Sequence, residues 1–170
     1  MENQLPRSFL SALYAVAALL LIAPALDLLG LTWPVRTTEP GWRFGSLGLG
    51  FEKSIIQIIG LSIAMATAAF LGHRRLLRGF SSLALVSAFL VVAGMARFLL
   101  DFGTIRSVMP VAELANFDAN AFRALLFATL AVPVLVVLGG RGWSASAHVE
   151  PVVPARRDQH IIPLHQRVRS

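Results

Sequence analysis

Charged residues are scarce in this chain, and a few of them lie within or beside long apolar stretches. Asp27 lies near the end of the first stretch, and Arg97 and Asp101 are one helical turn apart near the end of the third. A charge within a membrane helix costs about 2.5–3.5 kcal/mol on insertion scales, so such residues usually face the bundle interior and pair. We therefore expect Asp27 to pair with Arg97 at similar depth. Gln57 and Asp101 would join this polar cluster, with Arg123 at its edge.

This cluster has one functional and two structural interpretations. It could be an ion or ligand site in the outer half of a helical bundle. Alternatively, Arg97 extends toward the interface and neutralises Asp101, or an ion pair fixes how the helices align. The acid and base candidates match no known catalytic motif, so the sequence predicts a protein that is not an enzyme. The chain has no cysteine, which excludes thiolate metal sites and cysteine nucleophiles, and we expect no metal and no cofactor.

Four apolar stretches must position these residues, at approximately 9–31, 54–72, 79–100 and 121–140. A helix needs about 20 apolar residues to cross a hydrocarbon core about 30 Å thick. The chain is 56% apolar with a mean hydropathy of +0.70, against roughly 45–50% apolar residues in soluble domains. These features predict an all-α membrane protein, a four-transmembrane-helix bundle of two helical hairpins. The first stretch is longer than the core of a signal peptide, so we expect it to be retained as a helix.

The basic residues are distributed unevenly between the two sides of the predicted bundle. One side carries Arg7, Arg141 and two segments rich in arginine, the connection 73–78 and the C-terminal tail. The loops at about 32–53 and 101–120, on the other side, carry both signs of charge. The positive-inside rule then places both termini in the cytoplasm. We expect a multi-pass protein of a bacterial inner (plasma) membrane, with its transmembrane domain at 1–143. The polar, proline-containing segment 144–170 predicts a disordered basic tail that attracts anionic lipid.

The second stretch carries a small residue at every fourth position. Small residues let membrane helices approach closely, so this stripe predicts a packing face against another helix of the chain, or against a second copy. Tryptophans are expected at headgroup depth, with the segment 42–51 lying along the outer interface as a loop. The stripe consists of Gly60, Ala64, Ala68 and Gly72, and the interfacial tryptophans are Trp33, Trp42 and Trp143.

The functional prediction rests on the absence of a catalytic motif and of a nucleic-acid-binding patch, and on the position of the charged residues. The net charge of +6 is not accompanied by an aromatic-basic patch, so nucleic acid is not an expected partner. We expect a non-catalytic accessory, assembly or interaction subunit that contacts the lipid bilayer and either a membrane-protein partner or further copies of itself. The alternative is a small oligomeric transporter or ion pathway that uses the Asp27/Arg97 cluster.

Overall fold

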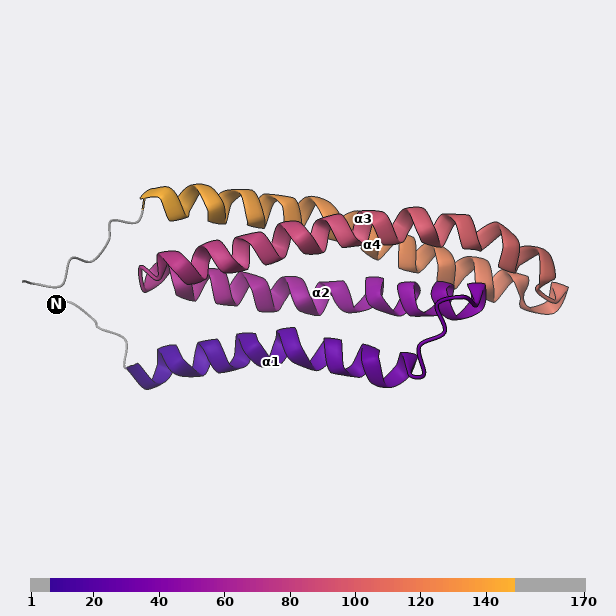
Figure 1. Cartoon of the computed structure of the whole chain (residues 1–170), viewed down its shortest axis with the longest axis horizontal. Helices are drawn as coiled ribbons and strands as arrows, with labels where there is room; N and C mark the ends of the chain where they lie inside the picture. Colours follow the sequence, from indigo (N-terminus) through magenta and orange to yellow (C-terminus); the bar gives the residue numbers. More distant parts are fainter. Residues whose placement is uncertain (1–6, 149–170) are drawn as a thin grey trace, which may run out of the picture.

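A computed structural model describes residues 7–148 as four long helices that run up and down along one axis (Figure 1). Within this range there is no strand. Each helix is long and apolar enough to cross a membrane, which confirms the all-helical fold with four candidate membrane spans. The predicted tail from residue 149 onward lies outside the described residues. The helices are α1 (Arg7–Thr32), α2 (Pro40–Phe70), α3 (Arg74–Val108) and α4 (Val111–His148).

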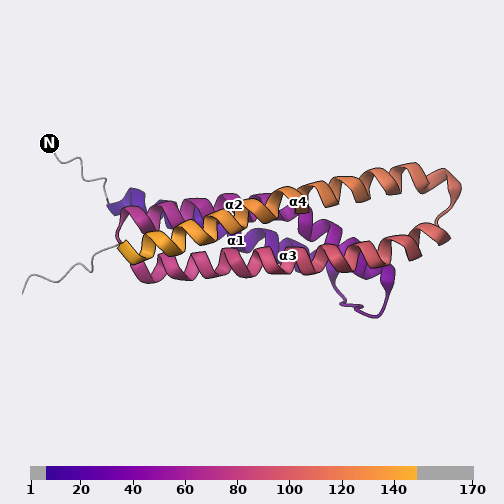
Figure 2. The ribbon, with the colours of Figure 1, turned by 90° about the horizontal axis from the view of Figure 1, so that it is seen from above.

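The four helices are not packed equivalently. α2, α3 and α4 pack against one another, whereas α1 packs against α2 and makes no close backbone approach to α3 or α4. Figures 1 and 2 show α1 along the side of the bundle and the α3–α4 connection projecting beyond the start of α2. A tight turn at Gly72 joins α2 to α3, and its φ of 68° is a left-handed conformation that favours glycine.

The helices extend well beyond the predicted apolar stretches. α2 begins at Pro40, so the segment 42–51, predicted as an interfacial loop, is helical. Proline suits this first turn because the missing N–H has no helical partner there anyway. α4 continues through residues 144–148, which the sequence analysis assigns to the tail. Hydropathy detects the lipid-crossing part of a helix, and it does not register polar or glycine-rich turns that packing holds in place.

Small and aromatic residues divide the core into three clusters along the bundle. Alanines dominate the buried positions, and such small side chains let helices approach closely and gain van der Waals contact. The aromatic cluster lies near the α3–α4 connection, and the other two follow toward the α2–α3 turn. In that order they contain Phe51, Phe98, Ala121, Ala124 and Ala128; then Leu61, Ala84, Ala88, Ala131 and Leu135; then Met65, Ala68 and Leu77.

Candidate functional site

Each helix contains one stretch without Asp, Glu, Lys or Arg, close in length to the roughly 20 residues that cross a bilayer. These stretches separate two ends of the bundle with different charge. We call the end with the α1–α2 and α3–α4 connections the paired end, and the end with the α2–α3 turn the basic end. The uncharged stretches are 8–26, 54–73, 79–96 and 124–140.

At the paired end, charges of both signs neutralise one another. Every Asp and Glu of residues 7–148 lies there, and all but Glu113 form ion pairs. Lys53 pairs with Asp27. The other pairs and their N–O distances are Arg36–Glu39 at 3.5 Å, Arg43–Asp101 at 2.9 Å, Arg97–Asp101 at 3.5 Å, Arg106–Asp118 at 2.9 Å and Arg123–Glu52 at 2.5 Å.

The predicted partners Asp27 and Arg97 lie in different ion pairs. Asp27 pairs with Lys53, on the helix next to its own. Arg97 approaches Asp101, a residue that is only 5% exposed and whose carboxylate accepts two hydrogen bonds from Arg43, at 3.0 Å from Nε and 2.9 Å from Nη2. Arg43 is therefore the main partner of Asp101. Sequence analysis missed this role because it assigned Arg43 to a loop.

The remaining members of the predicted cluster also form separate pairs. The amide of Gln57 donates to the hydroxyl of Ser87 at 2.8 Å, which joins α2 to α3. The Nε of Arg123 donates to the Glu52 carboxylate at 3.1 Å, which joins α4 to α2. The structure thus distributes the predicted cluster over several interhelical contacts, each with its own partner.

Two small cavities lie among these pairs. One of about 150 Å³ lies between α1 and α2 and includes Lys53, Gln57 and Pro24. Another of about 360 Å³ includes Arg43 and Arg97. Gln57 and Arg97, two members of the predicted cluster, therefore line different cavities.

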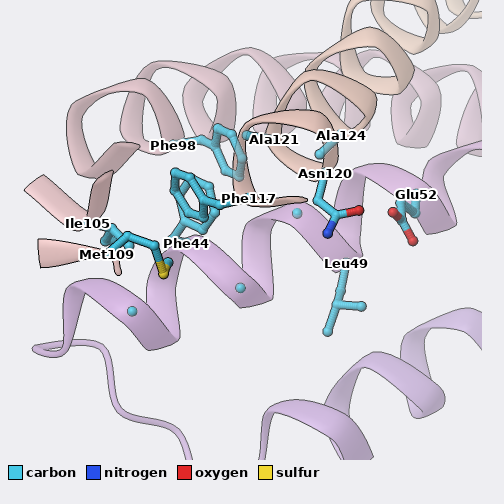
Figure 3. A pocket seen from close by; sticks show the side chains of 13 residues that line it. Phe44, Leu49, Glu52, Phe98, Ile105, Met109, Phe117, Asn120, Ala121 and Ala124 are labelled. Atoms are coloured by element: carbon cyan, nitrogen blue, oxygen red, sulfur yellow. The ribbon is translucent and has the colours of Figure 1, made fainter. Parts of the chain in front are cut away.

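A third cavity at the paired end is apolar and larger than these two. It has a volume of about 420 Å³ and lies between α2, α3 and α4. Figure 3 shows Phe44, Phe98 and Phe117 along it, and the Phe44 ring stacks on the other two with centroid distances of 4.0 and 5.1 Å. We call this cavity the aromatic pocket. It lies beyond the uncharged part of α2, in the helical segment that sequence analysis assigned to a loop.

Glycines keep the α2 wall of the aromatic pocket open. Gly41, Gly45 and Gly48 lie on one face of α2 and line it. A Cβ added at Gly41 or Gly45 would meet no atom within 4 Å. In the sequence these glycines are four and three residues apart, which is the spacing of one face of a helix. The sequence analysis missed this face because it assigned the segment to a loop.

The lining of the aromatic pocket is apolar except for two side chains. Glu52 is the titratable residue that lines it, and the Glu52 carboxylate is already paired with Arg123. Asn120 adds one amide near Glu52 (Figure 3). Among residues 7–148, no group of three or more His, Asp or Glu side chains is arranged to hold a metal ion. The pocket is suited to hold apolar groups beside one or two hydrogen-bonding groups.

The small-residue stripe of α2 lies against other parts of the same chain. A Cβ on Gly60 would lie 3.0 Å from the Leu20 Cβ and 3.3 Å from the Ala17 carbonyl oxygen, so α1 packs closely here. Ala64 and Ala68 are buried, and Gly72 forms the turn before α3.

The tryptophans lie at both ends of the bundle. Trp33 is exposed in the α1–α2 connection. The Trp42 indole donates to the Thr32 carbonyl at 2.8 Å, which ties the start of α2 to the end of α1. Trp143, at the basic end, lies beneath the Arg78 guanidinium.

Comparison with known proteins identifies no relative. No protein-family model matches the chain, and no significant match is found among curated proteins or solved structures. Function must therefore be inferred from the geometry of the site.

Proposed function

We propose that this chain is a non-catalytic interaction subunit that binds another membrane protein, as an accessory or assembly component of a bacterial inner-membrane system. The aromatic pocket carries the proposal. Its walls are the half-buried Phe44 and Phe117, stacked over the buried Phe98 or on one another, and a row of glycines, beyond the uncharged stretch of α2. Burial of apolar surface stabilises by about 25 cal/mol per Å², so a partner that inserts an apolar side chain gains binding energy here. Aromatic-lined pockets of this kind accept the anchor residues that dominate binding.

The ion pairs around the pocket support binding through a preformed surface. Arg43–Asp101 and Arg123–Glu52 join α2 to α3 and to α4, the helices that enclose it. Walls held together in this way reduce the conformational entropy that association would otherwise cost. The positive-inside rule, applied to the arginines of the basic end, supports an orientation with the aromatic pocket on the outer side of the membrane and both termini in the cytoplasm.

Filling the pocket tests this function. Gly45→Leu places a side chain in the cavity, and Gly103→Leu is the matched control. Both glycines lie within helices with no atom within 4 Å of an added Cβ, but Gly103 does not line the pocket. Both substitutions improve helix propensity by a similar amount, up to about 1 kcal/mol.

The measurement is quantitative co-purification from native membranes in mild detergent. We expect a membrane protein to be recovered in fixed ratio with the wild type and with Gly103→Leu. Its recovery should fall about tenfold with Gly45→Leu, which corresponds to about 1.4 kcal/mol of binding energy. Purification of the wild-type chain without a stoichiometric partner, or equal recovery with both variants, would overturn the proposal.

The small cavity between α1 and α2 supports a second candidate function, an oligomeric transporter or ion pathway. Lys53 and Gln57 line this cavity beside Pro24. Proline has no N–H, which leaves the Leu20 carbonyl without its helical partner, and such carbonyls line ion sites in broken membrane helices.

Flux and accessibility measurements separate the two functions. The chain contains no cysteine, so a single Gln57→Cys variant can be labelled without background. A transporter predicts labelling of this position by a membrane-impermeant maleimide, and ion flux in proteoliposomes that Lys53→Met abolishes. An interaction subunit predicts no flux above that of protein-free liposomes.

A further inference from the structure

At the basic end, four arginines form no ion pair with any described residue, whereas every cation at the paired end forms one. Among the described residues, no ion pair involves Arg74, Arg75, Arg78 or Arg141, and no Asp or Glu lies at this end. By contrast, each Lys and Arg at the paired end has a carboxylate within 4.0 Å. The described part of the basic end therefore carries positive charge that it does not neutralise itself.

One of these arginines has a buried donor without an acceptor. The Nε of Arg74 is buried and forms no hydrogen bond with any described residue. A buried unpaired donor costs free energy, so a bound acceptor that reaches it would be stabilised. A cavity of about 310 Å³, lined by His73, Arg74, Arg75 and Leu76, lies beside it. This hollow is open to the surface and mostly apolar, and it lies directly beside the side chains of Arg74 and Arg75.

A third guanidinium is held in place one helical turn further along α3. The Nε of Arg78 donates to the Ser146 hydroxyl at 3.1 Å, and its guanidinium carbon lies 5.9 Å from the centroid of the Trp143 ring. These contacts come from α4, which lies beside the start of α3 at this end (Figure 1). They orient Arg78 through its Nε and its flat face, so both Nη groups stay available to a ligand.

From these observations we propose that Arg74, Arg75 and Arg78 form a binding site for the phosphate of an anionic phospholipid. Guanidinium groups bind phosphate oxygens in pairs, and planar arginine does so better than lysine. The first turn of α3 adds the positive end of its helix dipole, and its N-cap residue His73 makes no side-chain capping bond. This site is separate from the aromatic pocket, and it goes beyond the proposed binding of a protein partner.

The position of the site favours a lipid over free phosphate. The arginines directly follow the uncharged stretches 54–73 on α2 and precede 79–96 on α3, which places them at headgroup depth in a bilayer. Phe70 and Leu76 are exposed on either side of the turn and offer apolar surface to acyl chains. A phospholipid can place its phosphate against the arginines and its acyl chains against Phe70 and Leu76, whereas inorganic phosphate can contact only the arginines.

The test uses the full-length chain in a neutral detergent and compares two triple variants. In one, Arg74, Arg75 and Arg78 are all replaced by glutamine. In the other they are replaced by lysine, which keeps the charge, and with it the topology, but removes the planar guanidinium groups. Native mass spectrometry and thermal unfolding are followed as phosphatidylglycerol, phosphatidylcholine or inorganic phosphate is added.

We expect the wild type to retain one phosphatidylglycerol and to bind it about tenfold more tightly than phosphatidylcholine. The lysine triple variant should lose most of this preference, and the glutamine variant all of it. Equal preference in the wild type and the lysine variant would show diffuse attraction and overturn the site. Stabilisation by millimolar inorganic phosphate equal to that by the lipid would overturn the lipid assignment. Because the lysine variant keeps its charge, its result decides the proposal even if the glutamine variant fails to insert.

Discussion

Gly139 lies where α4 passes α3, and its replacement by alanine is expected to destabilise the bundle. A Cβ there would lie 2.6 Å from the Leu85 Cγ and 3.0 Å from the Ser81 carbonyl oxygen. The Leu85 side chain can turn aside, but the Ser81 carbonyl belongs to the backbone of α3 and cannot. The two helices must therefore move apart by a few tenths of an ångström along a buried contact.

The size of the effect follows from two opposing contributions. Forcing extra volume into a packed contact typically costs about 1–3 kcal/mol. Replacing glycine with alanine within a helix contributes about 0.5–1 kcal/mol of stability. Gly140 follows on the same helix, and its added Cβ would meet no atom within 4 Å. Gly140→Ala should therefore show the stabilising contribution alone, and Gly139→Ala should show both.

The assay compares the free energies of unfolding of the two variants in one detergent. The helix-propensity contribution is common to both, so the difference between them isolates the packing cost. We expect Gly139→Ala to be less stable than Gly140→Ala by about 1–3 kcal/mol. Equal stabilisation of both variants would refute the close contact between α4 and the Ser81 carbonyl.

Three other substitutions test separate parts of the fold. Gly60→Val should loosen α1 from α2, because even a Cβ lies 3.0 Å from the Leu20 side chain; disulfide cross-linking between introduced cysteines on the two helices should slow. Gly72→Ala should lower the free energy of unfolding by about 1–2 kcal/mol, since its φ of 68° is unfavourable for a residue with a Cβ. Asp101→Asn should lower the melting temperature more than Asp118→Asn, because the Asp101 carboxylate is buried and bridges α2 and α3, whereas the Asp118 pair is exposed; an equal decrease would contradict this difference in burial.

Hydropathy predicted the four helices because the cost of burying backbone and charge in lipid leaves few alternatives to a long apolar helix. It did not predict the first turns of α2. The segment 41–50 contains four glycines, and glycine weakens an isolated helix by about 1 kcal/mol per residue. Tertiary contacts outweigh that preference, since Phe44 stacks on α3 and α4 and Arg43 binds Asp101.

The expected Asp27–Arg97 pair shows that the depth of two residues in the membrane does not determine whether they are in contact. Depth fixes where a side chain lies along the bundle axis, but not which neighbour it faces. Among the described helices, the backbone of α1 comes close only to that of α2, and Lys53 lies on α2 at the level of Asp27. Consecutive helices usually pack side by side, so the nearest cation across the first hairpin was the better candidate.

The two ends of the bundle should respond differently to ionic strength. At the paired end, cations and carboxylates neutralise one another within the chain, and the aromatic pocket between them is apolar. The proposed partner binding would depend on apolar burial, which added salt does not screen. At the basic end, arginines without an ion pair to any described residue would attract the proposed anionic lipid across a partly hydrated surface, where the screening length shortens from about 10 Å at 0.1 M salt to about 3 Å at 1 M. Lipid retention should therefore decrease across this range while partner recovery persists, so salt separates the two proposed binding activities without any substitution.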